Sequence, residues 1–148
     1  MNNPPEDLSL GHATAYILIY TSKYNDGEIK DNEFLMVLKS MEYWMGSGTS
    51  DDELRKLLIE TDEWFQSGTN FERLQTLDYL INLMKAQTTG RPSVLRELFE
   101  DCIFICASNN PKYNSLFTNE KDSSYQLMLK ELMVEFPLLE KMKAKLLG

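Results

Sequence analysis

Histidine and cysteine are scarce in this chain. Among its 148 residues there is one histidine, His12, and there are two cysteines, Cys102 and Cys106. A single histidine excludes most histidine-based catalytic dyads and multi-histidine metal sites. Two cysteines do not make a disulfide framework in a chain of this length. The sequence also lacks a nucleotide-binding glycine loop, a nucleophile elbow and a zinc motif, so we predict a protein that is not an enzyme.

Long apolar runs are absent as well. None approaches the roughly 20 residues that a membrane-spanning helix needs. The stretch Met1–Ser9 has no basic segment followed by an apolar one, as a secretory signal would have. We therefore expect a cytoplasmic protein with no membrane insertion. Hydrophobic residues make up 43% of the chain and charged residues 26%, which is typical of a soluble globular domain.

Basic residues are outnumbered, and the imbalance is confined to one half. Residues 1–74 carry 6 basic and 14 acidic side chains, whereas residues 75–148 carry 9 of each, so the first half supplies the whole net charge of −8. Binding to nucleic acid or anionic lipid depends largely on Lys and Arg at phosphates. We therefore expect no nucleic-acid partner. An acidic surface favours cations or basic partners, or serves solubility alone.

Apolar residues recur at helical spacing nearly everywhere, and no strand pattern is convincing. We predict an all-α bundle of six or seven helices, with a polar leader at 1–7 and a single helical domain at 8–148. Where the spacing gives both ends of a helix, we predict the ranges 8–22, 31–45, 93–107 and 119–135.

Several short signals mark where helices begin and end. The residues Ser50–Glu53 and Thr69–Glu72 each have the spacing of a full capping box. Gly46 and its neighbours stop the second helix, Pro92 suits a first helical position, and Pro137 marks the break before a short last helix. The run 102–107 is apolar on all sides, which predicts a central, buried fifth helix.

The chain also has a faint two-fold internal repeat. Tyr16–Met41 and Cys102–Leu132 each combine an apolar helix, a polar turn and a second apolar helix, with Phe117 in the place of Ile29. The second turn is nearly uncharged. If the halves are related, only the first kept an acidic turn.

That acidic turn spans residues 25–33 and is the most informative stretch of the chain. It reads N-D-G-E-I-K-D-N-E and carries four acids in nine positions, Asp26, Glu28, Asp31 and Glu33. Gly27 permits a sharp bend. A helix, an acidic turn and a second helix can hold a hard cation through oxygens, and Ca²⁺ tolerates irregular geometry.

The same residues also fit helix capping without metal. Asp31 would cap the second helix, Glu33 would favour its positive end, and Gly27 would end the first helix. The spacing is not that of an EF-hand, because its third ligand position would be Lys30. Both interpretations stay open at this point.

The motif resembles that of a known family. The pattern of an apolar helix, Lys23, Asp26-Gly27-x-Ile29-x-x-x-Glu33 and further leucines is similar to the signature of the TerB family, the small acidic proteins of tellurite-resistance and related stress operons. The resemblance implies about seven helices and no established enzymatic activity. It also implies a divalent-cation site, with Ca²⁺ the expected ion, at positions such as those matching Asp26 and Glu33. The expected partners are other stress-operon proteins at the inner face of the membrane.

Other candidate residues each have a functional and a structural interpretation. Cys102 and Cys106 lie one helical turn apart on one face. They fit either a thiol pair for soft-metal, tellurium oxyanion or redox chemistry, or two small core residues. His12 fits a surface or packing residue better than a catalytic base. Asp78 fits a boundary position on an amphipathic helix or a buried carboxylate. Three aromatic residues fit the core or its edge, or a partner-binding patch: Trp44, Trp64 and Phe65.

Three functions follow from these features. The first is a non-enzymatic, TerB-like stress-response protein tuned by a divalent cation at Asp26, Glu28, Asp31 and Glu33. The second is an acidic interaction module, of the adaptor or immunity type, that binds a basic protein surface without metal. The third, an enzyme with carboxylate chemistry, has no motif to support it.

Overall fold

A computed structural model describes residues 4–26, 31–46, 48–107 and 123–148. These residues form seven α-helices and no strand, which confirms the predicted all-α bundle. No helix among them is long and apolar enough to cross a membrane. The helices, in chain order, are α1 (Leu10–Asp26), α2 (Asp31–Met45), α3 (Asp51–Ser67), α4 (Asn70–Gln87), α5 (Pro92–Ala107), α7 (Ser123–Glu135) and α8 (Pro137–Leu147).

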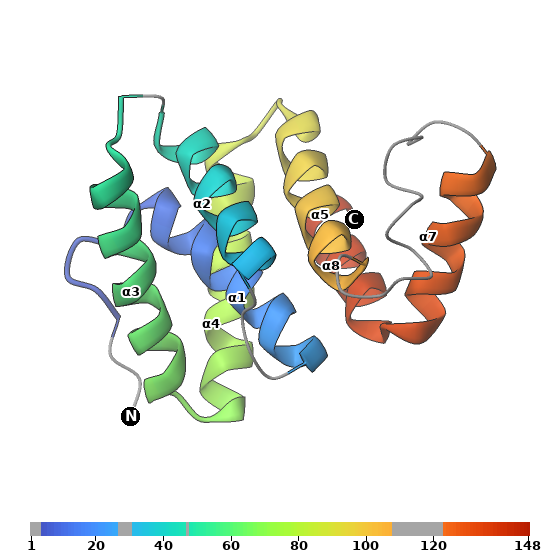
Figure 1. The fold of residues 1–148 in the computed structure, drawn as a ribbon, viewed down its shortest axis with the longest axis horizontal. Coiled ribbons are helices and arrows are strands. Elements are labelled where there is room, and N and C mark those ends of the chain that lie inside the picture. Colours follow the sequence, from blue (N-terminus) through green and yellow to red (C-terminus); the bar gives the residue numbers. More distant parts are fainter. Residues whose placement is uncertain (1–3, 27–30, 47, 108–122) are drawn as a thin grey trace.

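Helix α1 is the centre of the bundle. It contacts α2, α3, α4 and α5, and it runs between them in Figure 1. Its apolar side chains from Ala13 to Ile19 are fully buried on every side of the helix. The sequence predicted only one apolar stripe on this helix and a central, buried place for the fifth. The single stripe is wrong for α1, because its threonines are buried as well. Their hydroxyls are satisfied by donating to carbonyls one turn back, Thr14 to Leu10 and Thr21 to Ile17.

Helix α5 is buried along its C-terminal half, as the apolar run 102–107 predicted. Cys102, Ile103, Ile105 and Cys106 are all buried, whereas Phe104 is only partly covered. α5 packs against α1, α2 and α8. In Figure 1, α3 and α7 lie at opposite ends of the long axis. Among the described helices, α7 packs mainly against α8 and, to a lesser extent, α5.

Capping residues set several helix ends. Thr69 and Glu72 form the complete capping box that opens α4. At the start of α3, the Glu53 backbone N–H donates to Ser50 Oγ. This is one of the two hydrogen bonds of the capping box predicted there. Pro92 is the first residue of α5. Gly46 ends α2 with φ +98, a conformation that glycine adopts without a Cβ penalty.

Three predicted boundaries differ from the structure. α1 begins at Leu10 and continues to Asp26, four residues beyond the predicted end. Pro137 was predicted to mark the break before the last helix, whereas in the structure it is the first residue of that helix. α7 is described from Ser123, and the predicted residues 119–122 lie outside the described part. Phe117 and Ile29 lie outside it too, so the internal repeat stays a prediction.

Candidate functional site

The acidic turn joins the central helix to α2. α1 ends at Asp26 and α2 begins at Asp31, so the turn occupies the C-terminal end of one helix and the N-terminal end of the next. Glu28 and the side chains of Asp26 and Asp31 lie outside the described residues. Of the four predicted ligands, the structure therefore describes the side chain of Glu33 alone.

Glu33 lies in the first turn of α2 and is fully buried. Its Oε2 accepts a 2.7 Å hydrogen bond from the Ser22 hydroxyl of α1. A buried carboxylate costs free energy unless it is hydrogen-bonded, and the positive end of α2 adds to its stabilisation. The last acid of the motif therefore links the two helices that flank the turn.

The described residues hold no group of three or more His, Cys, Asp or Glu side chains arranged to bind a metal ion. The four-carboxylate site includes three side chains outside that part of the chain, so cation binding at the turn stays a prediction.

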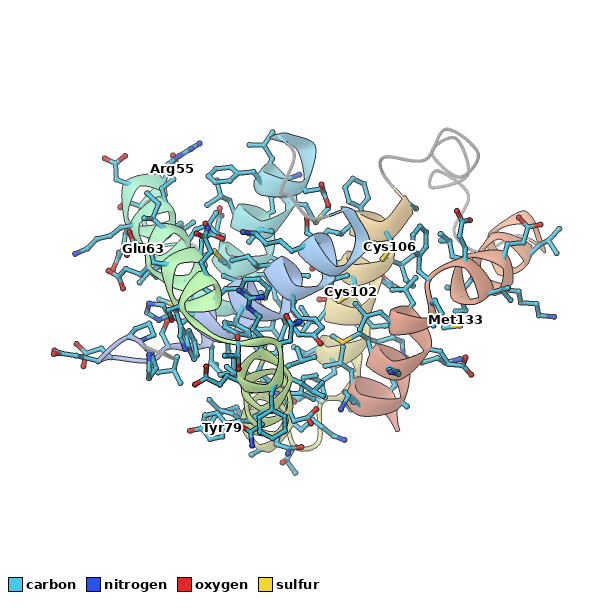
Figure 2. All side chains as sticks on the ribbon, turned by 90° about the horizontal axis from the view of Figure 1, so that it is seen from below. Arg55, Glu63, Tyr79, Cys102, Cys106 and Met133 are labelled. Carbon is cyan, nitrogen blue, oxygen red and sulfur yellow. The ribbon has the colours of Figure 1, made fainter. Side chains whose placement is uncertain are left out.

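The two cysteines lie in the core of the bundle. Cys102 and Cys106 are buried on α5 and form no disulfide with each other (Figure 2). The Thr21 hydroxyl donates to Cys102 Sγ at 3.7 Å. Burial raises the pKa of the Cys102 thiol to about 12, although the bond from Thr21 acts in the opposite direction. The structure thus places the pair as core residues, the second of the two interpretations that the sequence allowed.

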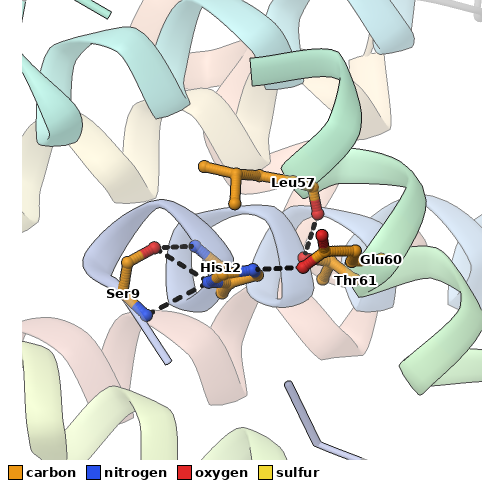
Figure 3. Close-up of polar contacts among 5 residues, drawn as sticks. All are labelled: Ser9, His12, Leu57, Glu60 and Thr61. Atoms are coloured by element: carbon orange, nitrogen blue, oxygen red, sulfur yellow. Dashed lines mark hydrogen bonds and ion pairs between the residues drawn. The ribbon is translucent and has the colours of Figure 1, made fainter. Parts of the chain in front are cut away.

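His12 is a packing residue with both ring nitrogens occupied (Figure 3). It is 2% exposed. Its Nδ1 accepts from the Ser9 backbone N–H at 3.1 Å, so Nδ1 carries no proton in this arrangement and Nε2–H donates to Glu60 Oε2 at 3.2 Å. Ser9 Oγ in turn accepts from the His12 backbone N–H. This reciprocal pair is a capping box with histidine in place of Glu or Gln.

The same three residues have the connectivity of a hydrolase triad, because Ser9 Oγ lies 2.8 Å from His12 Nδ1 and Glu60 holds the other nitrogen. The Ser9 hydroxyl is already used at the start of α1, and the imidazole is covered by protein. We therefore assign the cluster to capping α1 and tying it to α3. The spacing Ser9-x-x-His12 signals the cap in the sequence, whereas nothing local indicates Glu60.

The other singled-out residues also have structural roles. Asp78 is half-exposed and pairs with Lys145, which joins α4 to α8, so its predicted boundary position is confirmed. Trp64 and Phe65 pack on the buried Tyr16 ring at centroid distances of 4.6 and 5.4 Å. Trp44 is partly buried beside Tyr43, at the edge of the core.

Sequence reasoning missed a partly buried acid between α2 and α5. Ser40 Oγ donates to Asp101 Oδ2 at 2.8 Å. Burial raises the pKa of Asp101 to about 6, with the nearby acids Glu100 and Glu97 adding to the rise and the Ser40 bond opposing it. The acid stands next to Cys102 at the start of an apolar run, and only that position hints at its burial.

Sequence reasoning also missed a hollow beside the last turns of α1. It has a volume of about 660 Å³ and is lined by residues from three helices, among them Lys23 of α1, Phe65 of α3 and Arg73 of α4. These residues are 42 and 8 positions apart, so no local motif reports them. The hollow combines cationic side chains with an aromatic wall, which is a binding chemistry different from that of the acidic turn.

Comparison of this chain with protein-family models, with curated proteins and with solved structures finds no match. The TerB resemblance is therefore carried by the sequence motif that runs from Lys23 to Glu33.

Proposed function

We propose that this chain is a non-enzymatic, TerB-like stress-response protein that binds a divalent cation such as Ca²⁺ at the acidic turn 25–33. The observation that carries the proposal is the bond between Ser22 and the buried Glu33 carboxylate. It makes one acid of the motif a structural link between α1 and α2. A change of charge in the turn therefore acts directly on the packing of these helices.

The electrostatics of the turn support a cation. The last carbonyl groups of α1 point toward the turn and give it a partial negative charge. Asp26, Glu28 and Asp31 add three carboxylates within six residues. Carboxylate and carbonyl oxygens are the ligands that Ca²⁺ prefers, in sets of six to eight.

The basic residue of the last α1 turn is engaged by α3. Lys23 Nζ lies 3.1 Å from Asp62 of α3 and 5.5 Å from the centre of the Phe65 ring. Among the described residues, its positive charge is thus matched by an acid outside the turn. A bound cation would supply the compensation, fix the α1–α2 angle, and alter the surface that a partner protein of the stress operon reads.

Calorimetric titration of metal-stripped protein with Ca²⁺ tests the proposal. We expect saturable binding that Asp26→Asn abolishes. Asp52→Asn is the matched control, because Asp52 is an exposed aspartate in the first turn of α3 and its loss removes the same charge away from the turn. Binding should persist in the control. No heat of binding in the parent protein, together with no change in its melting temperature in millimolar Ca²⁺ or Mg²⁺, contradicts the proposal.

A second candidate function is an interaction module without metal. The observation that favours it is the outer side of α4, where Phe71 is 69% and Tyr79 59% exposed. Exposed aromatic residues are typical anchors of protein interfaces, and the acidic first half of the chain would complement a basic partner. This function predicts a partner that is recovered at low salt, is indifferent to chelators, and is lost in Phe71→Ser. The control is Ile59→Ser on α3, an apolar residue that is also exposed, at 57%.

A further inference from the structure

The hollow beside α1 is built around one aromatic ring with a cation on each of two neighbouring helices. Lys23 of α1 lies 5.5 Å from the centre of the Phe65 ring, and the Arg73 guanidinium of α4 lies 4.5 Å from it. Tyr20 meets the same ring edge-on at 6.2 Å. All four residues line the hollow.

The two cations differ in how their charge is matched. Lys23 is paired with the Asp62 carboxylate. Arg73 donates to three neutral oxygens, the carbonyls of Phe65 and Gln66 and the side-chain oxygen of Asn70. Among the described residues, no carboxylate pairs with Arg73. Within the part of the chain that the structure describes, the positive charge of the guanidinium is therefore not matched by a carboxylate.

Arg73 also keeps hydrogen-bonding capacity. A guanidinium has five N–H donors in a fixed fork, and the recorded bonds use one on each of its three nitrogens. Two donors remain, one on each terminal nitrogen. A carboxylate is the acceptor that suits a guanidinium best, because its bonds to the cation are charge-assisted.

The remaining wall suits an apolar body attached to that carboxylate. Leu74 borders the hollow and is 44% exposed, beside the rings of Tyr20 and Phe65. The first residue of α4, Asn70, lies at the same place, so the positive end of the helix adds to the attraction for an anion. The nearest acid of that helix turn, Glu72, is directed to the Thr69 backbone N–H by the capping box.

We propose that this hollow binds a small organic carboxylate with a flat apolar body. Its carboxylate would be held by Arg73, and its apolar part would pack between Phe65, Tyr20 and Leu74. The site is independent of cation binding at the acidic turn.

The chain contains an internal comparison for this proposal. Arg55 of α3 also lies over an aromatic ring, that of Phe34, at 5.4 Å. Its Nε, however, donates to the Asp51 carboxylate at 2.7 Å, so its charge is matched within the protein. Arg55 and Arg73 thus share the cation–aromatic contact and differ in the unmatched charge.

Naphthoate is a suitable probe, with naphthyl methanol as its uncharged counterpart, and binding is followed by NMR titration of the full chain. We expect saturable shifts at the residues of the hollow and a dissociation constant at least about tenfold lower for naphthoate than for the alcohol. Arg73→Gln and Leu74→Asp should each weaken naphthoate binding at least about tenfold. Arg55→Gln should leave it unchanged.

Arg73 also caps the end of α3, so Arg73→Gln can disturb the fold, and circular dichroism is recorded for every variant. Leu74→Asp leaves the capping bonds in place and places a negative charge at the rim, so it tests the site without that complication. Three outcomes overturn the proposal. These are no saturable binding of naphthoate, equal binding of acid and alcohol, and binding that survives in Leu74→Asp.

Discussion

The hydroxyl of Ser22 in α1 donates a 2.7 Å hydrogen bond to the fully buried carboxylate of Glu33 in α2. Ser22 precedes the acidic turn and Glu33 is its last residue, eleven positions further along the chain. The bond places an acid in the core at the point where the two helices meet. It therefore couples the turn to the stability of the bundle.

Ser22→Ala should lower the free energy of unfolding by about 1–3 kcal/mol, because the buried carboxylate loses a donor that water cannot replace. Urea denaturation measures the change. Ser93→Ala is the control, since Ser93 is exposed in the first turn of α5 and should change stability by less than about 0.5 kcal/mol. Equal stability of the parent and Ser22→Ala would contradict this account of the turn.

Asp101→Asn should raise stability more at neutral pH than at acidic pH. Burial raises the pKa of Asp101 from 3.8 to about 6 in the folded protein, so the folded state binds the proton more tightly than the unfolded state does. The contribution of the protonated Asp101 carboxyl to folding stability is therefore complete below the pKa of the unfolded state. It is lost as the pH rises through the pKa of the folded state. Asparagine retains an acceptor for Ser40 without the charge.

Urea denaturation of both proteins between pH 4 and pH 8 checks this. The stability gained by Asp101→Asn should grow with pH and reach on the order of 1–3 kcal/mol above pH 7. A gain that does not vary with pH would show that the carboxyl is not desolvated.

His12→Gln should be tolerated better than His12→Ala. Glutamine is an ordinary partner in a capping box and can still accept from the Ser9 N–H, whereas alanine leaves the start of α1 uncapped and the space beside Glu60 empty. We expect His12→Ala to cost about 1–3 kcal/mol of unfolding free energy, and His12→Gln less than half of that. Thermal and urea unfolding compare them. Equal losses would mean that an acceptor for the Ser9 N–H at this position contributes nothing to stability.

The thiols of Cys102 and Cys106 should resist alkylation in the native protein. Both are buried, so the reagent cannot reach them. Burial also raises the pKa of Cys102 to about 12, so little of the reactive thiolate is present. Mass spectrometry after iodoacetamide treatment at pH 8 should show no adduct without denaturant and two adducts in urea. Rapid labelling of the native chain would restore the redox interpretation of the pair.

Most helix positions could be predicted from local signals. These signals act within a few residues and can be recognised in the sequence alone. They are the caps at Ser50 and Thr69, Gly46 and Pro92. The end of α1 could not. Its last turns contain Thr21 and Ser22, which look like solvent-facing residues, yet both are fully buried because α5 and α2 supply the partners Cys102 and Glu33.

The candidate sites divide in the same way. The acidic turn is contiguous and was found, although three of its four side chains lie outside the described residues. The hollow was not found, because Lys23, Phe65 and Arg73 meet only after α1, α3 and α4 have packed. The burial of Asp101 and the link from His12 to Glu60 likewise depend on contacts between helices, which helical periodicity does not encode.

The central place of α1 has a consequence for synthesis on the ribosome. Thr21 reaches its partner Cys102 across 81 residues, so a nascent chain must carry its central helix through most of translation before α5 can cover it. At about 5–20 residues per second this interval lasts roughly 4–16 s. During it, α2, α3 and α4 can shield only the parts of the α1 surface that they contact in the folded bundle. The emerging chain is thus a natural client for chaperones that bind exposed apolar segments until α5 has left the exit tunnel.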